Sequence, residues 1–397
     1  MIIIGQVITY IMMICCGVGA VATIARPKSK LAASFNEGLG ILGICFVPCM
    51  AIMVSIPVIS KFATTVFSGI SQKGLDIACI AAMFLPADSG GYAMVHALAA
   101  TPEAMIIGML ISIMIGCTLA FNIGFGVSVN NKSDQRYVAM GTMCGLIGIP
   151  FGIFISCLIM MFTKPYIRLE FATAGASTYQ LQMTLSMIFI NMIPAIIICL
   201  LLVILLKLIP EIMIRGFIIL GKILSAALTI IAAASIIEYY TGIFSHTVGW
   251  PFDGVIADEN NTFRAIELIG SIGMVLSGAY PMVYLIRKYL GNGLEKMGRL
   301  AGLDAVGSTG LILGMVNIPA ALTMVNKLRP HDKVIVVAFT ICAGYSLADW
   351  MAFSMNFQPN LLAIIFVGEI TAGIFSIFAA KLLVLKKIEK EESTREQ

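Results

Sequence analysis

The sequence predicts an all-α polytopic membrane protein that contains an inverted structural repeat. The first observation is composition: 59% of the 397 residues are hydrophobic and 12% are charged, whereas soluble domains carry about 25% charged residues. The second is that apolar runs long enough to cross a bilayer follow one another along the chain. The third is that residues of one half recur in the other half at a constant spacing. The small net charge of +4, without a basic patch rich in aromatic residues, gives no indication of nucleic acid binding.

Nine apolar runs have the length of about 20 residues that a membrane-spanning helix needs. They lie near residues 2–24, 39–60, 103–125, 137–162, 183–206, 216–240, 265–286, 331–352 and 361–385. Two further apolar segments are interrupted at their centres, and we name them hairpin 1 (residues 75–100) and hairpin 2 (residues 303–326). Each of their arms has about 8–13 residues and reaches only the middle of a bilayer. We therefore expect both hairpins to be re-entrant.

Positive charge predicts the orientation of the spans. If both hairpins return to the side from which they start, most lysines and arginines of the loops face the cytoplasm, as the positive-inside rule requires. If hairpin 1 crossed the membrane instead, Lys132 and Arg136 would face outside. In the topology with two re-entrant hairpins, the acidic residues Asp253, Asp258 and Glu259 lie in an outer loop. We expect the N-terminus outside and the C-terminus in the cytoplasm.

Several residues recur 228 positions later in the chain, which indicates two copies of one segment. Gly74-Leu75-Asp76 recurs as Gly302-Leu303-Asp304, and Pro102 recurs as Pro330. Because the first copy starts inside and the second starts outside, the repeat is inverted, which is typical of secondary transporters that bind substrate at the bilayer midplane. Each copy contains a span, a hairpin, a broken span and a further span.

The chain is therefore expected to consist of five parts. They are an N-terminal span with its cytoplasmic loop (1–34), repeat 1 (35–162), a linking pair of spans (163–262), repeat 2 (263–385) and a cytoplasmic tail (386–397). The linking pair lies outside both copies, so we expect it to form a scaffold or the interface of a homodimer.

The tip of hairpin 1 is the stretch Leu85-Pro86-Ala87-Asp88-Ser89-Gly90-Gly91-Tyr92. A charged aspartate in the middle of a membrane costs roughly 2.5–3.5 kcal/mol on insertion scales, so it indicates a functional site. Pro86 and the two glycines break a helix. Non-helical backbone at this depth is stable only inside protein or beside a cavity. We therefore predict a binding site at this tip.

Two long spans contain predicted breaks at equivalent places, at residues 120–126 and 348–353. Together with the hairpin tips, these breaks would gather four polar side chains around a central cavity: Asp88, Asn122, Asn317 and Asp349. Two hairpins and two broken helices in inverted copies suggest an elevator-like secondary transporter, by analogy at the level of the fold.

Over nearly its whole length, the chain resembles the ethanolamine transporters encoded in bacterial ethanolamine-utilisation operons. The order and spacing of several short motifs carry the resemblance, namely Phe35-Asn36-Glu37-Gly38, Asp88-Ser89-Gly90-Gly91, Ser133-Asp134-Gln135-Arg136-Tyr137, Ile149-Pro150-Phe151-Gly152, Asn191-Met192-Ile193-Pro194, Arg264-Ala265-Ile266-Glu267, Gly278-Ala279-Tyr280-Pro281-Met282, Asn317-Ile318-Pro319 and Asp349. The resemblance implies a multi-pass protein of the bacterial plasma (inner) membrane that imports ethanolamine for its breakdown, and that is not an enzyme.

The sequence also departs from the pattern of that family. Ala348-Asp349-Trp350 stands where members often have Gly-Asp-His, and Val316 stands where a second asparagine is frequent. A proton-handling histidine at position 350 is therefore absent. Coupling of transport to H⁺ or Na⁺ stays open.

Ethanolamine is a small cation with one hydroxyl, so a site for it needs a carboxylate, carbonyl oxygens and a group that both donates and accepts. Asp88 follows the first arm of hairpin 1, where helix carbonyls carry partial negative charge, and the amide of Asn317 suits the hydroxyl. The expected substrate-binding residues are Asp88, Ser89, Gly90, Gly91, Tyr92, Asn122, Asn317, Asp349, Trp350 and Tyr280. Tyr92, Trp350 and Tyr280 would offer aromatic faces to the cation. Glu267 and Glu369 are candidate relay groups.

Each of these residues also has a purely structural explanation. Asp88 could cap its own turn, and Asn317 could start the helix that follows it. Asp349 could belong to a structural pair. Glu267 and Glu369 could make hydrogen bonds between helices.

The sequence also has to be compared with functions other than import of ethanolamine. A carrier of another small amine or organic ion has the same layout. An intramembrane aspartyl protease needs two carboxylates that share a proton, but neither Asp88 nor Asp349 lies in a Tyr-Asp or Gly-x-Gly-Asp context. No zinc-protease, serine-hydrolase or P-loop motif occurs, and none of the ten cysteines has zinc-ligand spacing. We therefore expect no cofactor and no metal.

Overall fold

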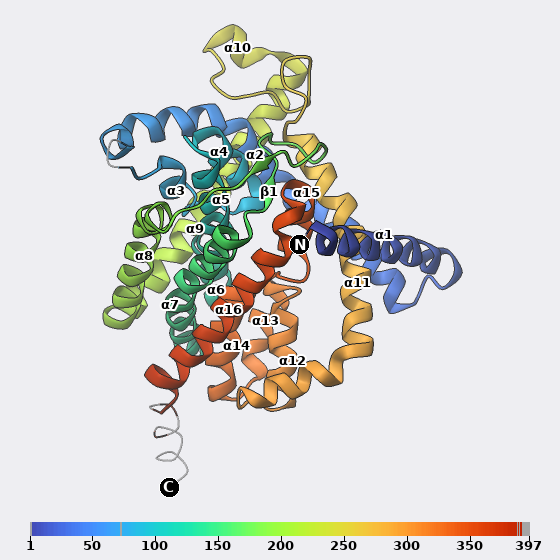
Figure 1. Cartoon of the computed structure of the whole chain (residues 1–397), viewed down its shortest axis with the longest axis vertical. Coiled ribbons are helices and arrows are strands. Elements are labelled where there is room, and N and C mark those ends of the chain that lie inside the picture. Colours follow the sequence, from blue (N-terminus) through green and yellow to red (C-terminus); the bar gives the residue numbers. More distant parts are fainter. Residues whose placement is uncertain (1, 72–73, 387, 389, 391–397) are drawn as a thin grey trace.

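The computed structural model describes residues 2–71, 74–386, 388 and 390, and most of these residues are helical (Figure 1). Most of the predicted tail, 386–397, lies outside the described residues. In chain order the elements are α1 (Ile2–Ala25), α2 (Lys30–Ser71), α3 (Ile77–Ala81), η1 (Ala87–Gly91), α4 (Tyr92–Leu98), α5 (Pro102–Ile111), η2 (Ser112–Gly116), η3 (Thr118–Asn122), α6 (Ile123–Ser128), α7 (Lys132–Thr163), β1 (Tyr166–Ile167), β2 (Tyr179–Gln180), α8 (Leu185–Leu208), α9 (Pro210–Thr241), α10 (Ile243–Thr247), α11 (Ala265–Leu300), α12 (Ala305–Gly314), α13 (Ile318–Met324), η4 (Val325–Lys327), α14 (Pro330–Ala343), α15 (Asp349–Phe357), η5 (Pro359–Leu361), α16 (Leu362–Ala380) and η6 (Lys381–Leu385). Segments η4 and η5 are 3₁₀-helical, and η2, η3 and η6 are π-helical. Segment η1 contains a kink with non-helical backbone at Ser89 and Gly90.

Eight helices of the described residues are long and apolar enough to cross a membrane, which agrees with the predicted polytopic all-α fold. The ninth predicted span, near residues 331–352, is divided into α14 and α15 by the residues 344–348. The prediction placed this break at 348–353. The structure instead makes Asp349 the first residue of α15, where a negative side chain is favoured by the helix dipole.

The other predicted break, at residues 120–126, is not an unwound turn. The backbone there stays helical from Pro102 to Ser128 and contains two π-helical segments, η2 and η3. A π-helical turn widens a helix while its backbone groups remain hydrogen-bonded, so the segment bends without exposing polar backbone inside a membrane.

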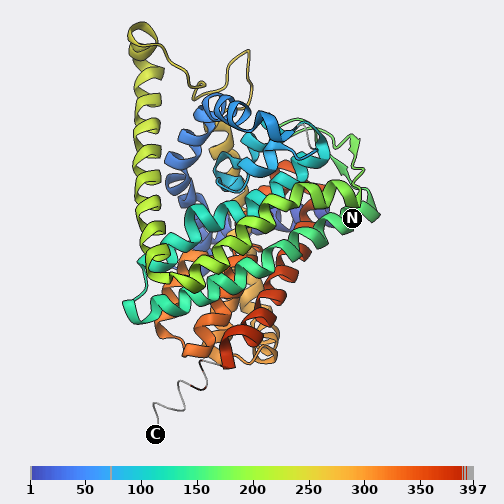
Figure 2. The same cartoon turned by 90° about the vertical axis from the view of Figure 1, so that its left-hand side faces the viewer.

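The helices differ greatly in how much of their surface the protein itself covers. The most hydrophobic window of the segment 102–128 is 83% buried, so this segment forms the centre of the molecule. The corresponding window of α9 is only 11% buried, and Figure 2 shows α9 standing apart at the edge of the molecule. Helices α7, α14 and α16 pack together, and α2 packs along α11. Helix α1 contacts α11 and α2 and crosses the long axis in Figure 1.

An aspartate closes the base of each hairpin. Asp76 caps α3 by accepting a hydrogen bond from the backbone N–H of Ala78 (2.9 Å), and its other oxygen accepts from the N–H of Ala100 (2.8 Å). Asp304 caps α12 and forms an ion pair with Arg329 (2.9 Å). Both segments therefore return to the place from which they start. We call these contacts the hairpin clasps.

The segments 30–163 and 265–385 contain the same order of elements. Each has a long helix, a clasped hairpin, an interrupted helix that begins with proline, and a last long helix. The glycine before each clasp also has a positive φ, +80° for Gly74 and +92° for Gly302, a conformation that glycine adopts easily. The two copies of one segment and the inverted relation between them stay predictions.

Candidate substrate site

Small residues allow the chain to turn sharply at the tip of hairpin 1. Pro86 ends the first arm, and Gly90 turns the chain with φ = +97°, a region that side chains other than hydrogen rarely enter. At Gly91 an added Cβ would come within 2.5 Å of the carbonyl oxygen of Pro86. The sequence Asp88-Ser89-Gly90-Gly91 thus folds into a compact turn that only glycine permits at these two positions.

Hydrogen bonds fix this turn against the centre of the molecule. The hydroxyl of Ser112 in η2 donates to the carbonyl oxygen of Leu85 (2.5 Å). The Cys49 thiol of α2 lies 3.5 Å from the carbonyl oxygen of Asp88. The hydroxyl of Ser89 donates to the carboxyl of Asp88 (3.3 Å). Asp88 is therefore held in one place by its own turn and by two neighbouring helices.

The break between α14 and α15 is joined to the tip of hairpin 2. The N–H of Tyr345 donates to the carbonyl oxygen of Gly314 (3.1 Å), and the N–H of Leu347 donates to that of Met315 (2.9 Å). Tyr345 has φ = +61°, and a bulky residue in this region is backbone strain that clusters at functional sites. Asp349 begins α15 immediately after this strained turn.

Asp88 and Asp349 meet. Their side chains are hydrogen-bond partners, although 261 residues of sequence separate them. Both side chains keep partial exposure. Two ionised carboxylates at hydrogen-bond distance repel each other strongly away from water, and either one shared proton or a bound cation relieves the repulsion. We call these two residues the carboxyl pair.

Four segments of the chain contribute to the surroundings of the carboxyl pair. Tyr280 of α11, Cys49 of α2, Cys117 between η2 and η3, and Tyr345 of the break all lie near enough to interact with the charge of Asp349. The thiol of Cys117 in turn lies 3.7 Å from the amide oxygen of Asn122. The structure thus brings Tyr280 and Asn122, which the sequence predicted, to the same region as the pair.

Sequence reasoning missed Tyr345, Cys49 and Cys117. Cysteines in apolar runs are most often small core residues, and nothing in their spacing distinguishes these two. For Tyr345 there was a signal, because Gly344-Tyr345-Ser346 interrupts an apolar run in the same way as the hairpin tips do.

The rings of Tyr92 and Trp350 are enclosed by other aromatic rings. Tyr92 is 1% exposed, packs against Phe353 and Phe357 at centroid distances of 5.6 Å, and its hydroxyl accepts a hydrogen bond from Gln358 (2.8 Å). Trp350 is 3% exposed and lies edge-on to Phe353. Their predicted role as aromatic walls stays a prediction, and this packing favours Tyr280 and Tyr345 for that role.

Asn317 combines a structural contact with a free donor group. Its side-chain oxygen accepts a hydrogen bond from the N–H of Ala320 (2.9 Å) and so caps α13. The capping explanation is therefore correct for the oxygen. The amide nitrogen of this partly exposed side chain can still donate to a ligand, so a binding role stays a prediction.

The two candidate relay groups have different surroundings. Glu267 lies in the first turn of α11 and accepts hydrogen bonds from the N–H groups of Ala257 and Arg264 (3.2 and 3.1 Å), so it caps a helix and anchors a loop. The structure does not bring Glu267 to the carboxyl pair. Glu369 lies in the middle of α16 and is 1% exposed, and neither carboxyl oxygen has a hydrogen-bond partner among the described residues.

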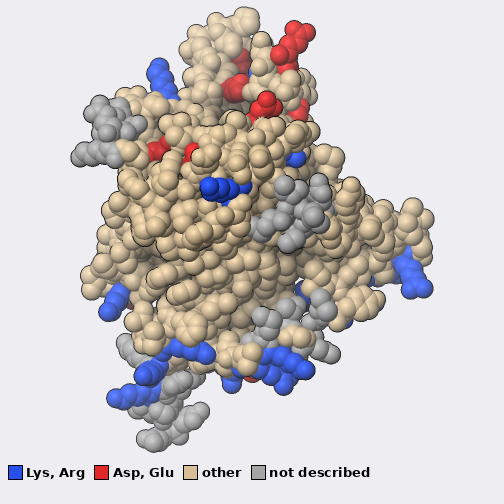
Figure 3. Space-filling view, in the orientation of Figure 1, with Lys and Arg blue, Asp and Glu red and all other residues tan. Residues whose placement is uncertain are grey.

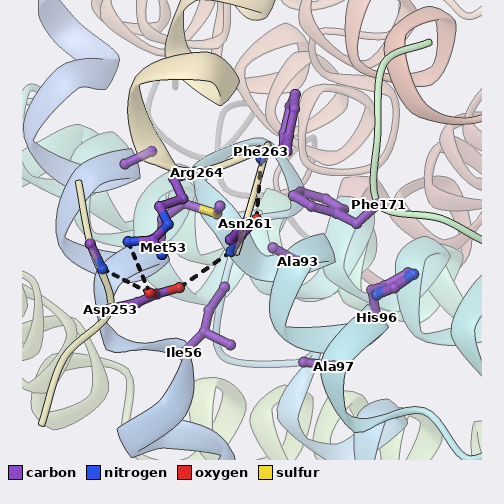
Figure 4. A pocket seen from close by; sticks show the side chains of 12 residues that line it. Met53, Ile56, Ala93, His96, Ala97, Phe171, Asp253, Asn261, Phe263 and Arg264 are labelled. Carbon is purple, nitrogen blue, oxygen red and sulfur yellow. Dashed lines mark hydrogen bonds and ion pairs between the residues drawn. The ribbon is translucent and has the colours of Figure 1, made fainter. Parts of the chain in front are cut away.

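A cavity of about 210 Å³ lies beside the second arm of hairpin 1. Figure 4 shows Ala93 and His96 of α4 on one side, and Asp253 and Arg264 on the other. Arg264 forms an ion pair with Asp253 (3.3 Å) and another with Asp258 (2.8 Å).

The loop beside this cavity is held by its own polar groups. Hydrogen bonds from the backbone of Asn261 and Asn260, together with the positive charge of Arg264, hold the pKa of Asp258 below its usual range. The His96 ring bonds the carbonyl oxygen of Leu169 (2.6 Å), which agrees with the polar packing that such a residue commonly has.

The described residues contain no cluster of three or more His, Cys, Asp or Glu side chains that could hold a metal ion. The carboxyl pair offers two acidic groups and the thiols around it are free. Carboxyl groups accept hydrogen bonds, so the pair can accept them from a ligand.

A family model described as "Ethanolamine utilisation protein, EutH" matches residues 4–383 of the chain. The chain belongs to this family. Among curated proteins, the probable ethanolamine permease EutH of Listeria monocytogenes is 29% identical over 396 residues, covering 99% of this chain and 98% of the relative. The probable ethanolamine permease EutH of Escherichia coli is 30% identical over 415 residues, covering 97% and 96%. No solved structure matches the chain significantly.

Membership in this family agrees with the resemblance drawn from the sequence motifs. The names of these relatives describe permeases and not enzymes. Together with the apolar helices, they identify this member as a multi-pass membrane protein.

Proposed function

We propose that the protein imports ethanolamine across the inner membrane of a bacterium, and that the substrate ammonium binds at the carboxyl pair. Full-length relatives that are named probable ethanolamine permeases support the substrate. The carboxyl pair is the observation that carries the position of the site, because two acidic side chains from distant parts of the sequence meet among buried helices.

The chemistry of the substrate fits this site. A primary ammonium has three N–H donors, and the carboxylates of Asp88 and Asp349 are strong acceptors for them. Gly90 and Gly91 leave space for the backbone to approach the substrate. The amide nitrogen of Asn317 and the hydroxyl of Tyr345 are candidates to bind the hydroxyl of ethanolamine. The phenol rings of Tyr280 and Tyr345 would face the cation.

Alternating access follows from the position of the pair between two separately clasped hairpins. Hairpin 1 carries Asp88, and the tip of hairpin 2 holds the break that leads to Asp349. Movement of one hairpin away from the other would open the site to one side of the membrane at a time. The elevator-like mechanism is the form of this movement that the two predicted copies favour.

The distribution of charge supports the expected orientation. Figure 3 shows that lysines and arginines gather at the lower end of the molecule, where the C-terminus lies, and that acidic side chains gather at the upper end. The positive-inside rule assigns the lower end to the cytoplasm. Hairpin 1 would then be reached from outside and hairpin 2 from the cytoplasm.

Helices α8 and α9 form the linking pair of spans. The apolar surface of α9 is almost wholly uncovered, which supports its assignment to the scaffold, and a homodimer interface on this helix stays an expectation. Loops between α7 and α8 reach back to the site helices, since Arg168 donates to the carbonyl oxygen of Asn356 (2.6 Å).

A carboxyl pair is also the arrangement that an aspartyl protease uses. The relatives' names describe transport, and they argue against that alternative. A carrier for another small amine or organic ion would use the same groups, and competition between substrates distinguishes these cases.

The experiment is uptake of labelled ethanolamine into liposomes that contain the purified protein. We expect saturable uptake that unlabelled ethanolamine blocks and that citrate does not block. Liposomes without protein give the passive background. Efficient uptake of an organic anion, or no saturable uptake of any amine by folded protein, would refute the proposal.

A further inference from the structure

Besides the carboxyl pair, another acidic side chain lies inside the membrane part of the molecule, away from polar partners. Glu369 lies in the middle of α16, which packs against α7 and α14. Its side chain is 1% exposed, and neither of its carboxyl oxygens has a hydrogen-bond partner among the described residues. Burial of an ionised carboxylate without a partner is very unfavourable, so such a group is neutral or binds a cation.

The space beside Glu369 contains two more polar groups without partners. The hydroxyls of Ser346 and Ser354 line the same small cavity, each on a residue that is 1% exposed, and neither hydroxyl has a hydrogen-bond partner among the described residues. Four buried polar atoms without partners therefore surround one cavity. Groups of this kind are rare in native proteins and require an explanation.

Among the described residues, no cation compensates the charge of Glu369. In the described residues, no lysine, arginine or histidine contributes to its electrostatics. The side chains that α15 and the break contribute to the cavity include Ser346, Trp350 and Ser354, and none of these is titratable in the physiological range.

Groups on the other neighbouring elements are also neutral or occupied. On α7 the hydroxyl of Ser156 donates to the carbonyl oxygen of Ile364 (3.3 Å). On α14 the thiol of Cys342 lies 3.1 Å from the carbonyl oxygen of Gly145. The thiol of Cys117 lies near enough to interact with a charge on Glu369, and Asp349 begins α15. Thiols and a second carboxyl add no positive charge.

The size of the cavity identifies the occupant. At no point does the cavity have room for a water molecule. A metal cation with a shell of oxygen ligands at 2 Å or more needs a larger, preformed cage. A proton needs no space, and a protonated carboxyl can donate to either serine hydroxyl after a small shift.

We propose that Glu369 is a proton-binding residue that couples transport to the proton gradient, with Ser346 and Ser354 positioning its carboxyl. The O–H bond of Glu369 forms with a proton taken from water on one side of the membrane, and it breaks when water on the other side accepts that proton. This inference rests on the proposed function and adds the driving force.

The position of Ser346 connects the two sites. Ser346 follows Tyr345, whose N–H bonds the tip of hairpin 2, and it precedes Asp349 by three residues. A change in the charge of Glu369 therefore acts on the same short segment that holds one member of the carboxyl pair and one hairpin tip.

The test compares two transport measurements in liposomes that contain wild-type protein, Glu369→Gln or a control variant. Glutamine has the shape of a protonated glutamate but cannot release a proton. We expect Glu369→Gln to exchange internal for external ethanolamine within about twofold of the wild-type rate, and to lose at least about tenfold of the accumulation that an imposed pH gradient drives. Liposomes without protein give the passive accumulation of the amine, which is subtracted.

Thr371→Val is the matched control on α16. Among the described residues, the hydroxyl of Thr371 bonds only the carbonyl oxygen of Val367 in its own helix (2.7 Å), so this variant should retain both exchange and accumulation. Glu369→Asp keeps a titratable group and should retain part of the accumulation.

A spectroscopic measurement tests the site without transport. The infrared spectrum of the purified protein should contain the carbonyl band of a buried protonated carboxyl, which disappears in Glu369→Gln and persists in Thr371→Val. Normal exchange together with undiminished accumulation in Glu369→Gln, or a spectrum that this substitution does not change, would overturn the proton site. Failure of wild-type protein to exchange ethanolamine would instead refute the proposed function.

Discussion

Replacement of Asp88 by asparagine tests the carboxyl pair most directly. The substitution keeps the shape of the side chain and the hydrogen bond from Ser89 (3.3 Å), but it removes one of the two negative charges. In the structure, Asp88 interacts with Asp349, and none of the salt bridges found among the described residues involves Asp88. The change therefore affects a bound cation without breaking an ion pair of the protein.

The magnitude follows from the interaction that is lost. A hydrogen bond to a charged group contributes about 1.5–3 kcal/mol, which corresponds to about 10- to 150-fold in the dissociation constant. We expect Asp88→Asn to weaken binding of ethanolamine by this factor, and Asp349→Asn to do the same. Because both residues hold one cation, the double variant should lose less than the sum of the two free-energy changes.

The assay is equilibrium binding of labelled ethanolamine to the purified protein, with saturable uptake as a second measurement. Asp253→Asn is a suitable control, because Asp253 lies in the loop between α10 and α11 and pairs with Arg264 (3.3 Å). A change of less than twofold in Asp88→Asn, with the control unchanged, would remove Asp88 from the binding site.

Three further changes test the fold and the site. Gly90→Ala should lower the melting temperature and reduce uptake, because φ = +97° costs a residue with a side chain roughly 1–2 kcal/mol and the new Cβ would lie 2.8 Å from Ile52. The control is Gly40→Ala, whose new Cβ would meet nothing within 4 Å. Equal stability of the two variants would contradict the strain argument. Asn317→Ala should remove the cap of α13, at a cost of about 1 kcal/mol, and should let ethylamine compete more equally with ethanolamine; unchanged selectivity would place the hydroxyl contact elsewhere. A single cysteine in place of the exposed Lys132 should react with impermeant reagents from the cytoplasm only, and labelling from outside would contradict the predicted topology.

The architecture was predictable because a membrane restricts what a chain can do. Apolar runs must be helices, and interruptions at membrane depth must be buried in protein, so the composition and the two interrupted segments predicted the helical fold and both hairpin positions. The bounds were less predictable. Helix α2 continues to Ser71, beyond the apolar run that ends near residue 60, because a helix can extend past the membrane into polar sequence.

The candidate site was predictable where a residue type conflicts with its surroundings. Asp88 and Asp349 stand out as charges in apolar sequence, and the structure brings them together. The same reasoning could not find Cys49 or Cys117, since a thiol in an apolar run is ordinary. It also misplaced the break before Asp349, because an acidic residue marks the start of a helix as readily as an interruption.

The two hairpin clasps are built from different kinds of interaction, and this gives the two gates of a transporter different strengths. The Asp76 side chain is buried at 8% exposure and bonds backbone N–H groups, which salt screens little. The ion pair of Asp304 with Arg329 has side chains that are 35% and 56% exposed, and exposed ion pairs weaken as ionic strength rises. Salt therefore loosens the base of hairpin 2 while it leaves the base of hairpin 1 intact. If the two hairpins act as the gates of the proposed transporter, the ionic strength on the side of hairpin 2 would shift which gate opens more often.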